Sequence, residues 1–593
     1  MHFRSTITLL CLTSPIAPTS LAQSTSRVSV DSAGVQGNGF SAWPSMSADG
    51  RYVAYMSDAS TLVPGDTNDD LDVFVHDRQT GATSRVSLSS AGLQVDGVSS
   101  EPSISADGRF VAFVSSASAL VPGDTNLAQD IFVRDRQTGT TARVSVDSMG
   151  AQGSGMSIHP SISADGRFVA FTYGAGDFDP SDTNGDPDVY VHDRQTGATT
   201  LVSRDTTGTP GNDESLEPSI SADGRYVAFV SLASNLVPGD VLFSYDVFVR
   251  DRLSGETSLV SKDSAGVFGN DVSRRPSISA DGRFVAFHSD ADNLVPDDTN
   301  GRSDVFIHDR LTGVTERASV DSGGVEGDAG SFRPSISADG RFVAYGSDST
   351  NLVPGDTNAF WDVVVHDRQT GQTCRASVST AGVQGASDSG RFFPVSVSAD
   401  GRYVAFDGTA GNLVSGDVAG FTDVFVRELR DPAVCRAGAV NAGAGPIADV
   451  LTVNGSTVLV TVAVGEPFRI DLSAAPLGPD PARYFAWVWL GYPANPYDFT
   501  ASGSTLGCTV NPTPFHRLAA PQAFRCLRGS GMPSAACRGI KELTSPPRAP
   551  WALVRNGGFG HRIVLTLQGV LEDAGAGNPV GFSVTNAVTL EIR

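Results

Sequence analysis

Loops rich in aspartate and asparagine recur along the chain and carry the side chains best able to bind a cation. The fullest copies read Asp66-Thr-Asn68-Asp-Asp70-Leu-Asp72 and Asp182-Thr-Asn184-Gly-Asp186-Pro-Asp188. Oxygen-bearing side chains at alternate positions of a turn are the ligands that a hard cation such as calcium uses. Three further copies keep three of these oxygens, at Asp124, Asn126 and Asp130, at Asp298, Asn300 and Asp304, and at Asp356, Asn358 and Asp362.

Two interpretations of these loops remain open. A comparison with the EF-hand fails because Pro187 stands where that loop needs glycine. The next candidate carboxylate, Asp193, lies at the far end of a predicted strand, roughly 17 Å away at about 3.3 Å per residue. Asp and Asn side chains also bond to their own backbone and stabilise turns without metal. Turn chemistry alone and calcium are both hypotheses here, and the copies at Asp66 and Asp182 are the best calcium candidates.

Each loop belongs to a repeat that a second phrase marks. This phrase occurs seven times. It consists of proline, a short apolar run, Ala-Asp-Gly-Arg and then Val-Ala-Phe or a near relative. The aspartates of this phrase are Asp49, Asp107, Asp165, Asp223, Asp281, Asp339 and Asp400. They are 58 residues apart except at the last step, which is 61. A fixed period of this size predicts a stacked or circular array, because one unit cannot bury its apolar faces alone.

Each repeat is predicted to form four strands. In the repeat around Asp281 they are 276–279, 283–287, 304–308 and 316–320. Asp-Gly between the first two suits a two-residue hairpin with positive backbone angles. The two middle strands are almost continuously apolar, which indicates a sheet buried on both faces between two neighbours. Four-stranded sheets packed radially make a β-propeller.

The two ends of the array indicate how it closes. The seventh repeat stops after its third strand, 423–427, whereas residues 26–30 match the fourth-strand sequence of the other repeats. We therefore expect the N-terminal strand to complete the last blade, which removes the free sheet edges of an open array. The prediction is an all-β protein with a seven-bladed propeller, and an open solenoid is the alternative.

The phrase Pro-Ser-Ile-Ser-Ala-Asp-Gly-Arg-Phe-Val-Ala-Phe resembles the WD40-like (PD40) repeat of TolB-type propellers, over residues about 26–430. Relatives with this repeat include periplasmic scaffolding proteins, the propeller halves of serine peptidases and some polysaccharide lyases. The resemblance therefore implies a fold and not one activity. The chain has no Gly-x-Ser-x-Gly elbow, so a peptidase half of that kind is missing.

Composition and the chain ends predict an exported protein. Residues 1–22 have the features of a signal peptide, 23–431 would form the propeller, and 432–593 a small β-sandwich-like domain. Five cysteines follow residue 22, and an exported location permits disulfides among them. The net charge of −23 opposes binding to nucleic acid. We expect a periplasmic, cell-surface or extracellular monomer that does not insert into a membrane.

Function in a symmetric ring should reside where the blades differ. The loops before the third strands and the connectors between blades are expected to share one rim. Extra aromatic residues on this rim are Phe40, Trp43, Phe360, Trp361, Phe392 and Phe421. Such a patch could bind a protein or glycan ligand, and packing between blades is the alternative role.

Catalytic signals are weak in this sequence. His76, His192, His308 and His366 share one strand position with arginines of other repeats, which suggests a solvated site. No catalytic residue is predicted, and calcium is the one cofactor considered. The preferred function is a recognition or scaffold protein. The alternative is a carbohydrate-active lyase or hydrolase in the funnel, which the Ser, Ile and Pro of the innermost strands disfavour.

Overall fold

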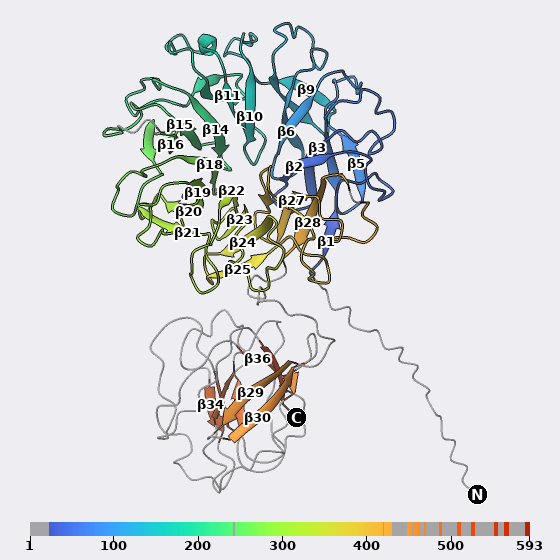
Figure 1. Ribbon diagram of the computed structural model, residues 1–593, viewed down its shortest axis with the longest axis vertical. Helices are drawn as coiled ribbons and strands as arrows, with labels where there is room; N and C mark the ends of the chain where they lie inside the picture. The colour runs from blue at the N-terminus through green and yellow to red at the C-terminus, as the bar shows by residue number, and fades with distance from the viewer. Residues whose placement is uncertain are drawn as a thin grey trace, which may run out of the picture. The chain divides into compact units, whose positions relative to one another are not determined.

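The computed structural model describes residues 23–429, except 241–243 and 419, and the backbone of nine strands between 447 and 592. Seven four-stranded antiparallel sheets are arranged around one axis (Figure 1). Among the described residues the single helical element is a short 3-10 turn, Gly176–Phe178. Contacts divide the chain into one compact unit that spans Ala22–Val440 and another that includes Asn441–Arg593. The predicted seven-bladed propeller is confirmed.

Every blade uses the same strand order from the axis outward. The innermost strands are β2 (Ser41–Met46), β6 (Ser99–Ile104), β10 (Ser157–Ile162), β14 (Ser215–Ile220), β18 (Ser273–Ile278), β22 (Ser331–Ile336) and β26 (Ser396–Val397). The second strands are β3 (Tyr52–Ser57), β7 (Phe110–Ser115), β11 (Phe168–Tyr173), β15 (Tyr226–Ser231), β19 (Phe284–Ser289), β23 (Phe342–Ser347) and β27 (Tyr403–Gly408).

The outer half of each blade is equally regular. The third strands are β4 (Asp72–Asp77), β8 (Asp130–Asp135), β12 (Asp188–Asp193), β16 (Asp246–Asp251), β20 (Asp304–Asp309), β24 (Asp362–Asp367) and β28 (Asp423–Glu428). The outermost strands are β5 (Ala82–Arg85), β9 (Thr140–Arg143), β13 (Thr199–Leu201), β17 (Glu256–Leu259), β21 (Val314–Arg317), β25 (Gln372–Arg375) and β1 (Thr25–Arg27).

The apolar middle strands are buried on both faces, as predicted. On β19, Val285 and Phe287 pack with Ala228 of the preceding blade. Ala286, which lies between them, packs with Val343 of the following blade. Successive side chains of a strand point to opposite faces, so the Val-Ala-Phe phrase joins each blade to both neighbours.

Two closed sets of hydrogen bonds run around the axis. In one, the backbone N–H of the alanine in each Ala-Asp-Gly turn donates to the carbonyl of the same alanine in the next blade, at 2.9–3.1 Å. This set passes through Ala48, Ala106, Ala164, Ala222, Ala280, Ala338 and Ala399, and returns to Ala48. In the other, a serine Oγ on each inner strand accepts from the backbone N–H at the end of the next inner strand, as Ser45 does from Ile104 at 3.1 Å.

The N-terminal strand completes blade seven, as predicted. β1 pairs antiparallel with β28, with Thr25 opposite Arg427 and Arg27 opposite Phe425 (Figure 1). The backbone N–H of Val28 continues the ladder by donating to Val424 O at 2.8 Å. The pairing extends over three residues and begins one residue earlier than the sequence indicated. The open solenoid is thereby ruled out.

The prediction of a two-residue Asp-Gly turn between the first two strands is wrong in its length. The backbone N–H of Ser279 donates to Phe284 O at 2.8 Å, so four residues, 280–283, form the turn. Only Gly282 has a positive φ, of 73°. A Cβ on Gly282 would lie 2.1 Å from Cδ2 of Tyr226 in the preceding blade. This glycine is therefore needed both for its backbone angle and for contact between blades.

The second compact unit is described here by its strands alone. They are β29 (Ile447–Val453), β30 (Ser456–Val462), β31 (Phe468–Arg469), β32 (Phe485–Val488), β33 (Gly507–Val510), β34 (Phe524–Leu527), β35 (Trp551–Val554), β36 (Ile563–Leu567) and β37 (Val588–Ile592). The signal peptide and most of the proposed sandwich lie outside the described residues and stay predictions, as do the disulfides. In the described part of the chain, no helix is long and apolar enough to cross a bilayer.

Replacing Gly282 by alanine should destabilise the propeller more than replacing Gly266. Gly266 also has a positive φ, of 90°, but a Cβ there would meet no atom within 4 Å. Gly266→Ala should therefore lose about 1 kcal/mol of unfolding free energy from backbone strain alone. Gly282→Ala should lose about 3 kcal/mol because the clash with Tyr226 adds to the strain. Denaturant unfolding measures both, and equal losses would contradict the proposed contact between blades.

Candidate functional site

One backbone position on the innermost strands is strained in six blades. The residue before the strand proline has a positive φ without being glycine. The six are Trp43 (57°), Glu101 (51°), His159 (55°), Glu217 (54°), Arg275 (54°) and Arg333 (53°). The pairing of the first two strands shifts register here, for example between Arg274 and Ser277. Such backbones are unfavourable by about 1–3 kcal/mol each and concentrate at functional sites.

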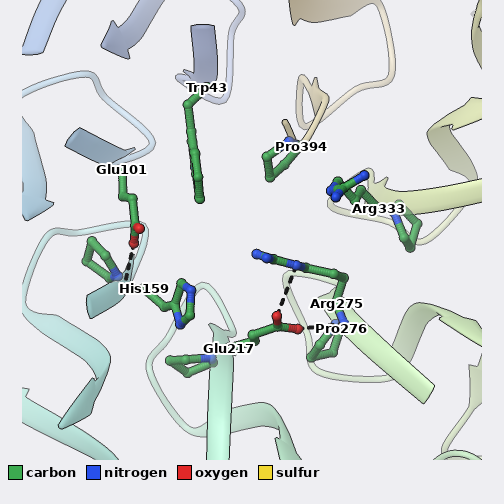
Figure 2. A pocket seen from close by; sticks show the side chains of 11 residues that line it. Trp43, Glu101, His159, Glu217, Arg275, Pro276, Arg333 and Pro394 are labelled. Atoms are coloured by element: carbon green, nitrogen blue, oxygen red, sulfur yellow. Dashed lines mark hydrogen bonds and ion pairs between the residues drawn. The ribbon is translucent and has the colours of Figure 1, made fainter. Parts of the chain in front are cut away.

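The six side chains point into one cavity on the propeller axis. Figure 2 shows them converging from six blades. The cavity has a volume of about 140 Å³. Its remaining walls are Pro160, Pro218, Pro276 and Pro334, which follow four of the strained residues, together with Pro394 of blade seven. Rigid proline rings thus support a ring of side chains that differ from blade to blade.

The acidic side chains of the cavity are held by the neighbouring blade. Glu101 Oε2 accepts from the backbone N–H of His159 at 2.8 Å. Glu217 Oε2 accepts in the same way from the N–H of Arg275 at 3.0 Å. Glu217 Oε1 also lies 3.0 Å from Arg275 Nε in an ion pair. The charge of Glu217 is therefore largely compensated, whereas Glu101 is held by a neutral backbone donor.

Arg333 is the cavity's second basic group. Its guanidinium donates to the carbonyl of Arg391 at 2.9 Å. Burial lowers the pKa of Arg333, and the charge of Arg275 lowers it further. Burial also lowers the pKa of His288, on the next strand outward, to about 3, and the charge of Arg333 contributes. The imidazole of His288 is therefore neutral at pH 7, and the basic sector consists of Arg275 and Arg333.

His159 has an unused hydrogen-bonding atom. Its Nδ1 is buried and has no partner. Burial lowers the pKa of His159, although Glu101 and Glu217 act in the opposite direction. A neutral imidazole with a free ring nitrogen can donate to or accept from a ligand. A buried polar atom left without a partner is unfavourable by about 1–3 kcal/mol, which a ligand in the cavity could offset.

The predicted aromatic patch is only partly assembled. Trp43 and Phe40 both contact Phe393, with ring centroids 5.6 and 5.7 Å apart. Trp361 instead packs against Phe332, at 5.5 Å. Phe360, Phe392 and Phe421 are 40, 61 and 43% exposed. Among the described residues, no ring contact joins these three to Trp43. Trp43 alone of the predicted aromatics lines the cavity.

Sequence reasoning missed the cavity although a signal was present. The residue before proline changes from Trp to Glu, His, Glu, Arg and Arg in successive blades, while the Pro-Ser-Ile or Pro-Ser-Met that follows hardly varies. The prediction that the shared histidine position is solvated is wrong. His76 is 6% exposed, and its Nδ1 lies 2.9 Å from Thr83 Oγ1. Arg134 takes the same place and donates to Thr141 Oγ1 at 3.0 Å.

The acidic loops lie on the same rim as the blade connectors, as predicted. Asn68 Nδ2 donates to the connector carbonyl of Val95 at 3.1 Å. The other loop asparagines make the same bond to the carbonyls of Gly153, Gly211, Gly327 and Gly385. In four loops the asparagine Oδ1 also accepts from the backbone N–H two residues later. The turn-forming role of these asparagines is thus visible in the structure.

In five blades the two aspartates of the loop face an arginine from the outermost strand. In blade one, Arg85 Nη1 lies 3.0 Å from Asp66 Oδ1 and 2.9 Å from Asp72 Oδ2. The corresponding arginines of blades two, five, six and seven are Arg143, Arg317, Arg375 and Arg27. Blades three and four have Leu201 and Leu259 at this position. Asp70, a further loop carboxylate of blade one, accepts from the N–H of Gly97 at 2.8 Å.

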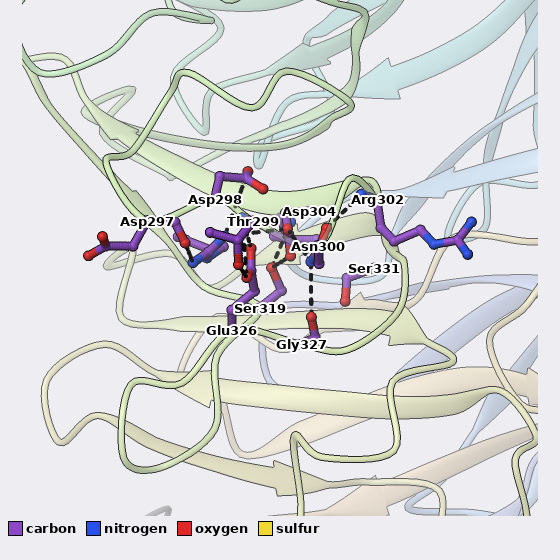
Figure 3. Close-up of polar contacts among 12 residues, drawn as sticks. Asp297, Asp298, Thr299, Asn300, Arg302, Asp304, Ser319, Glu326, Gly327 and Ser331 are labelled. Atoms are coloured by element: carbon purple, nitrogen blue, oxygen red, sulfur yellow. Dashed lines mark hydrogen bonds and ion pairs between the residues drawn. The ribbon is translucent and has the colours of Figure 1, made fainter.

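Blade five adds a third carboxylate to its pair. Oxygens of Asp298, Asp304 and Glu326 lie within 4.8 Å of one another (Figure 3). Arg317 Nη1 lies 3.6 Å from Asp298 Oδ2 and 3.5 Å from Asp304 Oδ2, and also contacts Glu326. Burial raises the pKa of Asp298, and the charge of Asp304 adds to that effect. This cluster therefore already contains a cation, supplied by the protein.

Arg85→Leu should destabilise the protein by about 3 kcal/mol at pH 7 in calcium-free buffer, because it leaves two buried carboxylates without a cation. Their pKa values in the folded state would then exceed the unfolded values, so the loss should shrink as the pH falls from 7 to 5. Denaturant unfolding at both pH values tests this. The exposed Arg302→Leu is the control. A loss of the same size at both pH values would indicate lost packing instead of lost charge.

No family model and no curated protein matches the chain. Among solved structures, it is similar to TolB from Acinetobacter baumannii, at 18% identity and a TM-score of 0.32, over 56% of this chain and 62% of that one. It is similar to a putative TolB from Agrobacterium tumefaciens at 16% identity and a TM-score of 0.31, over 48% of this chain and 81% of that one.

A third similar structure is the β-propeller domain of the Trilobed protease from Pyrococcus furiosus. The identity is 10% and the TM-score 0.40, over 66% of this chain and 95% of that one. The match spans less than two thirds of the Acinetobacter protein. The chain forms a seven-bladed β-propeller, closed by its N-terminal strand, with a charged cavity on its axis.

Proposed function

We propose that this protein is an exported, non-catalytic recognition protein that binds a carboxylate-bearing ligand in the axial cavity. The observation that carries this proposal is the convergence of six side chains, of four residue types and all on strained backbone, on one cavity of a repetitive ring. Six of the seven blades keep this backbone strain at the equivalent position although the side chain there varies. Strain of this kind persists where the surrounding structure holds it in place, and it is typical of ligand sites.

The cavity contains two glutamates and two arginines, so its formal charge is zero, and an anionic group would bind at the basic sector of Arg275 and Arg333. Arg275 and Arg333 provide guanidinium groups, which bind carboxylates with strong, directional hydrogen bonds. Arg275 is paired with Glu217, so Arg333 is the stronger candidate for the anion. The protein as a whole carries a net charge of −23, so a basic sector contrasts with its overall charge. Trp43 offers an aromatic surface beside the basic sector, suited to a side chain or a sugar ring.

A carbohydrate-active enzyme is the second candidate. The expectation that the funnel holds mainly Ser, Ile and Pro is wrong, because His159, Glu101 and two arginines line it. A neutral imidazole with a free nitrogen next to carboxylates and arginines has the composition that lyases and hydrolases use for proton transfer. The hydrogen bonds that hold both glutamates to the neighbouring backbone favour binding over turnover.

Arg333→Gln should weaken ligand binding by about tenfold or more, because it removes a charged donor from the cavity. Arrays of peptides and acidic oligosaccharides, each with free and with amidated or esterified carboxylates, identify the ligand and show whether it is a protein or a glycan. Arg302→Gln removes the same charge from an exposed loop and should bind as the wild type does. Equal binding of blocked and free carboxylates would refute the proposal.

A turnover assay separates the two candidate functions. The ligand that binds should be recovered intact after long incubation with the wild-type protein. Release of product that is lost in His159→Gln would favour the enzyme and overturn the non-catalytic assignment.

A further inference from the structure

Blade three has the same pair of buried loop aspartates as the other blades but has no arginine beside it. Leu201 replaces the arginine of the outermost strand, and Pro210 replaces the connector glutamine that in blade one also reaches the pair. Asp188 is fully buried and Asp182 is 5% exposed. The pair therefore keeps its burial while losing both of the side chains that hold it in blade one.

In blade three, one carboxylate oxygen of each aspartate has no cation beside it. In blade one, the aspartate pair binds a guanidinium. There, Arg85 Nη1 bonds Asp66 Oδ1 and Asp72 Oδ2. In blade three, Asp182 Oδ1 and Asp188 Oδ2 are buried and make no hydrogen bond of ordinary geometry. The side chains of Asn184 and Ser215 lie near Asp188 and act to lower its pKa, but neither carries a charge. The other two oxygens are bonded. Ser203 donates to Asp188 Oδ1 at 2.5 Å, and Tyr190, which stands where blade one has Phe74, donates to Asp182 Oδ2 at 2.8 Å.

Two buried carboxylates without a cation are electrostatically unfavourable. Burial raises the pKa of Asp188 to about 8, and the charge of Asp182 is among the causes that act in the same direction. Either a proton or a metal ion can relieve the repulsion. The donors are hard carboxylate oxygens, one on the loop and one at the start of β12, and such oxygens suit calcium better than a softer metal.

We propose that blade three binds one calcium ion between Asp182 and Asp188, at the position that a guanidinium takes in five other blades. The metal replaces the missing arginine as the counter-ion of the pair. The calcium hypothesis is thereby confined to a blade that lacks the arginine, and it is withdrawn from blade one. Blade four also lacks the arginine, but residues 241–243 of its loop lie outside the described part of the chain, and the proposal concerns blade three alone.

The test compares thermal unfolding of the full chain in 1 mM calcium chloride and in chelator. Wild type should melt about 3 °C higher with calcium, as for an ion at roughly a hundred times its Kd. Leu201→Arg should supply the guanidinium within the fold, so it should melt at least as high as the wild type in chelator and show no calcium shift. Asp188→Asn should also lose the shift.

The control is Leu253→Arg, which adds the same charge at a site that is 79% exposed and should keep the full calcium shift. Persistence of the shift in Leu201→Arg would place calcium elsewhere. An equal shift with magnesium chloride would reject the assignment to calcium. A wild type that ignores calcium but melts higher as the pH falls from 8 to 6 would show that a proton serves the pair, and would overturn the proposal.

Discussion

Contact between neighbouring blades is the constraint on which the rest of this structure depends. A single four-stranded sheet with apolar middle strands has two apolar faces, and each face must be buried against another sheet. The Ala and Ser hydrogen bonds around the axis then fix the distance between neighbours, seven times over. The glycine of each Ala-Asp-Gly turn follows from the same requirement, because the aromatic ring of the preceding blade occupies the space beside it.

This constraint explains which features could be predicted from the sequence. Burial on two faces leaves a direct signature in Val-Ala-Phe, and the unit split between residues 26–30 and 423–427 indicates closure. Ion pairs leave a weaker signature. Arg85 and Asp66 are 19 residues apart and lie on different elements. Only the folded structure therefore shows that the arginine occupies the position that the sequence suggested for a calcium ion. The mistaken interpretation of His76 has the same origin, because histidine and arginine can share a buried position when both reach one threonine.

The axial cavity escaped prediction for a different reason. The residues at this position have no residue type and no charge in common. A motif that recurs in every repeat is easy to recognise in the sequence, whereas a position at which the side chain varies is not. The structure reveals it through geometry, since six residues adopt positive φ at equivalent places. The prolines that follow restrict the backbone independently of the preceding side chain. The scaffold can therefore carry Trp43 in one blade and Arg333 in another without altering its neighbours.

The pairing of β1 with β28 has a consequence for how the protein folds. Ser24 and Glu428, which meet at this junction, are separated by 404 positions in the chain. Contacts of such sequence separation form late, because the entropy of closing so long a loop opposes them. Until then both ends of the blade array expose unpaired strands, which are prone to aggregate. Closure of the ring by β1 therefore protects both of these edges at once, and it depends on the meeting of the two most distant parts of the propeller sequence.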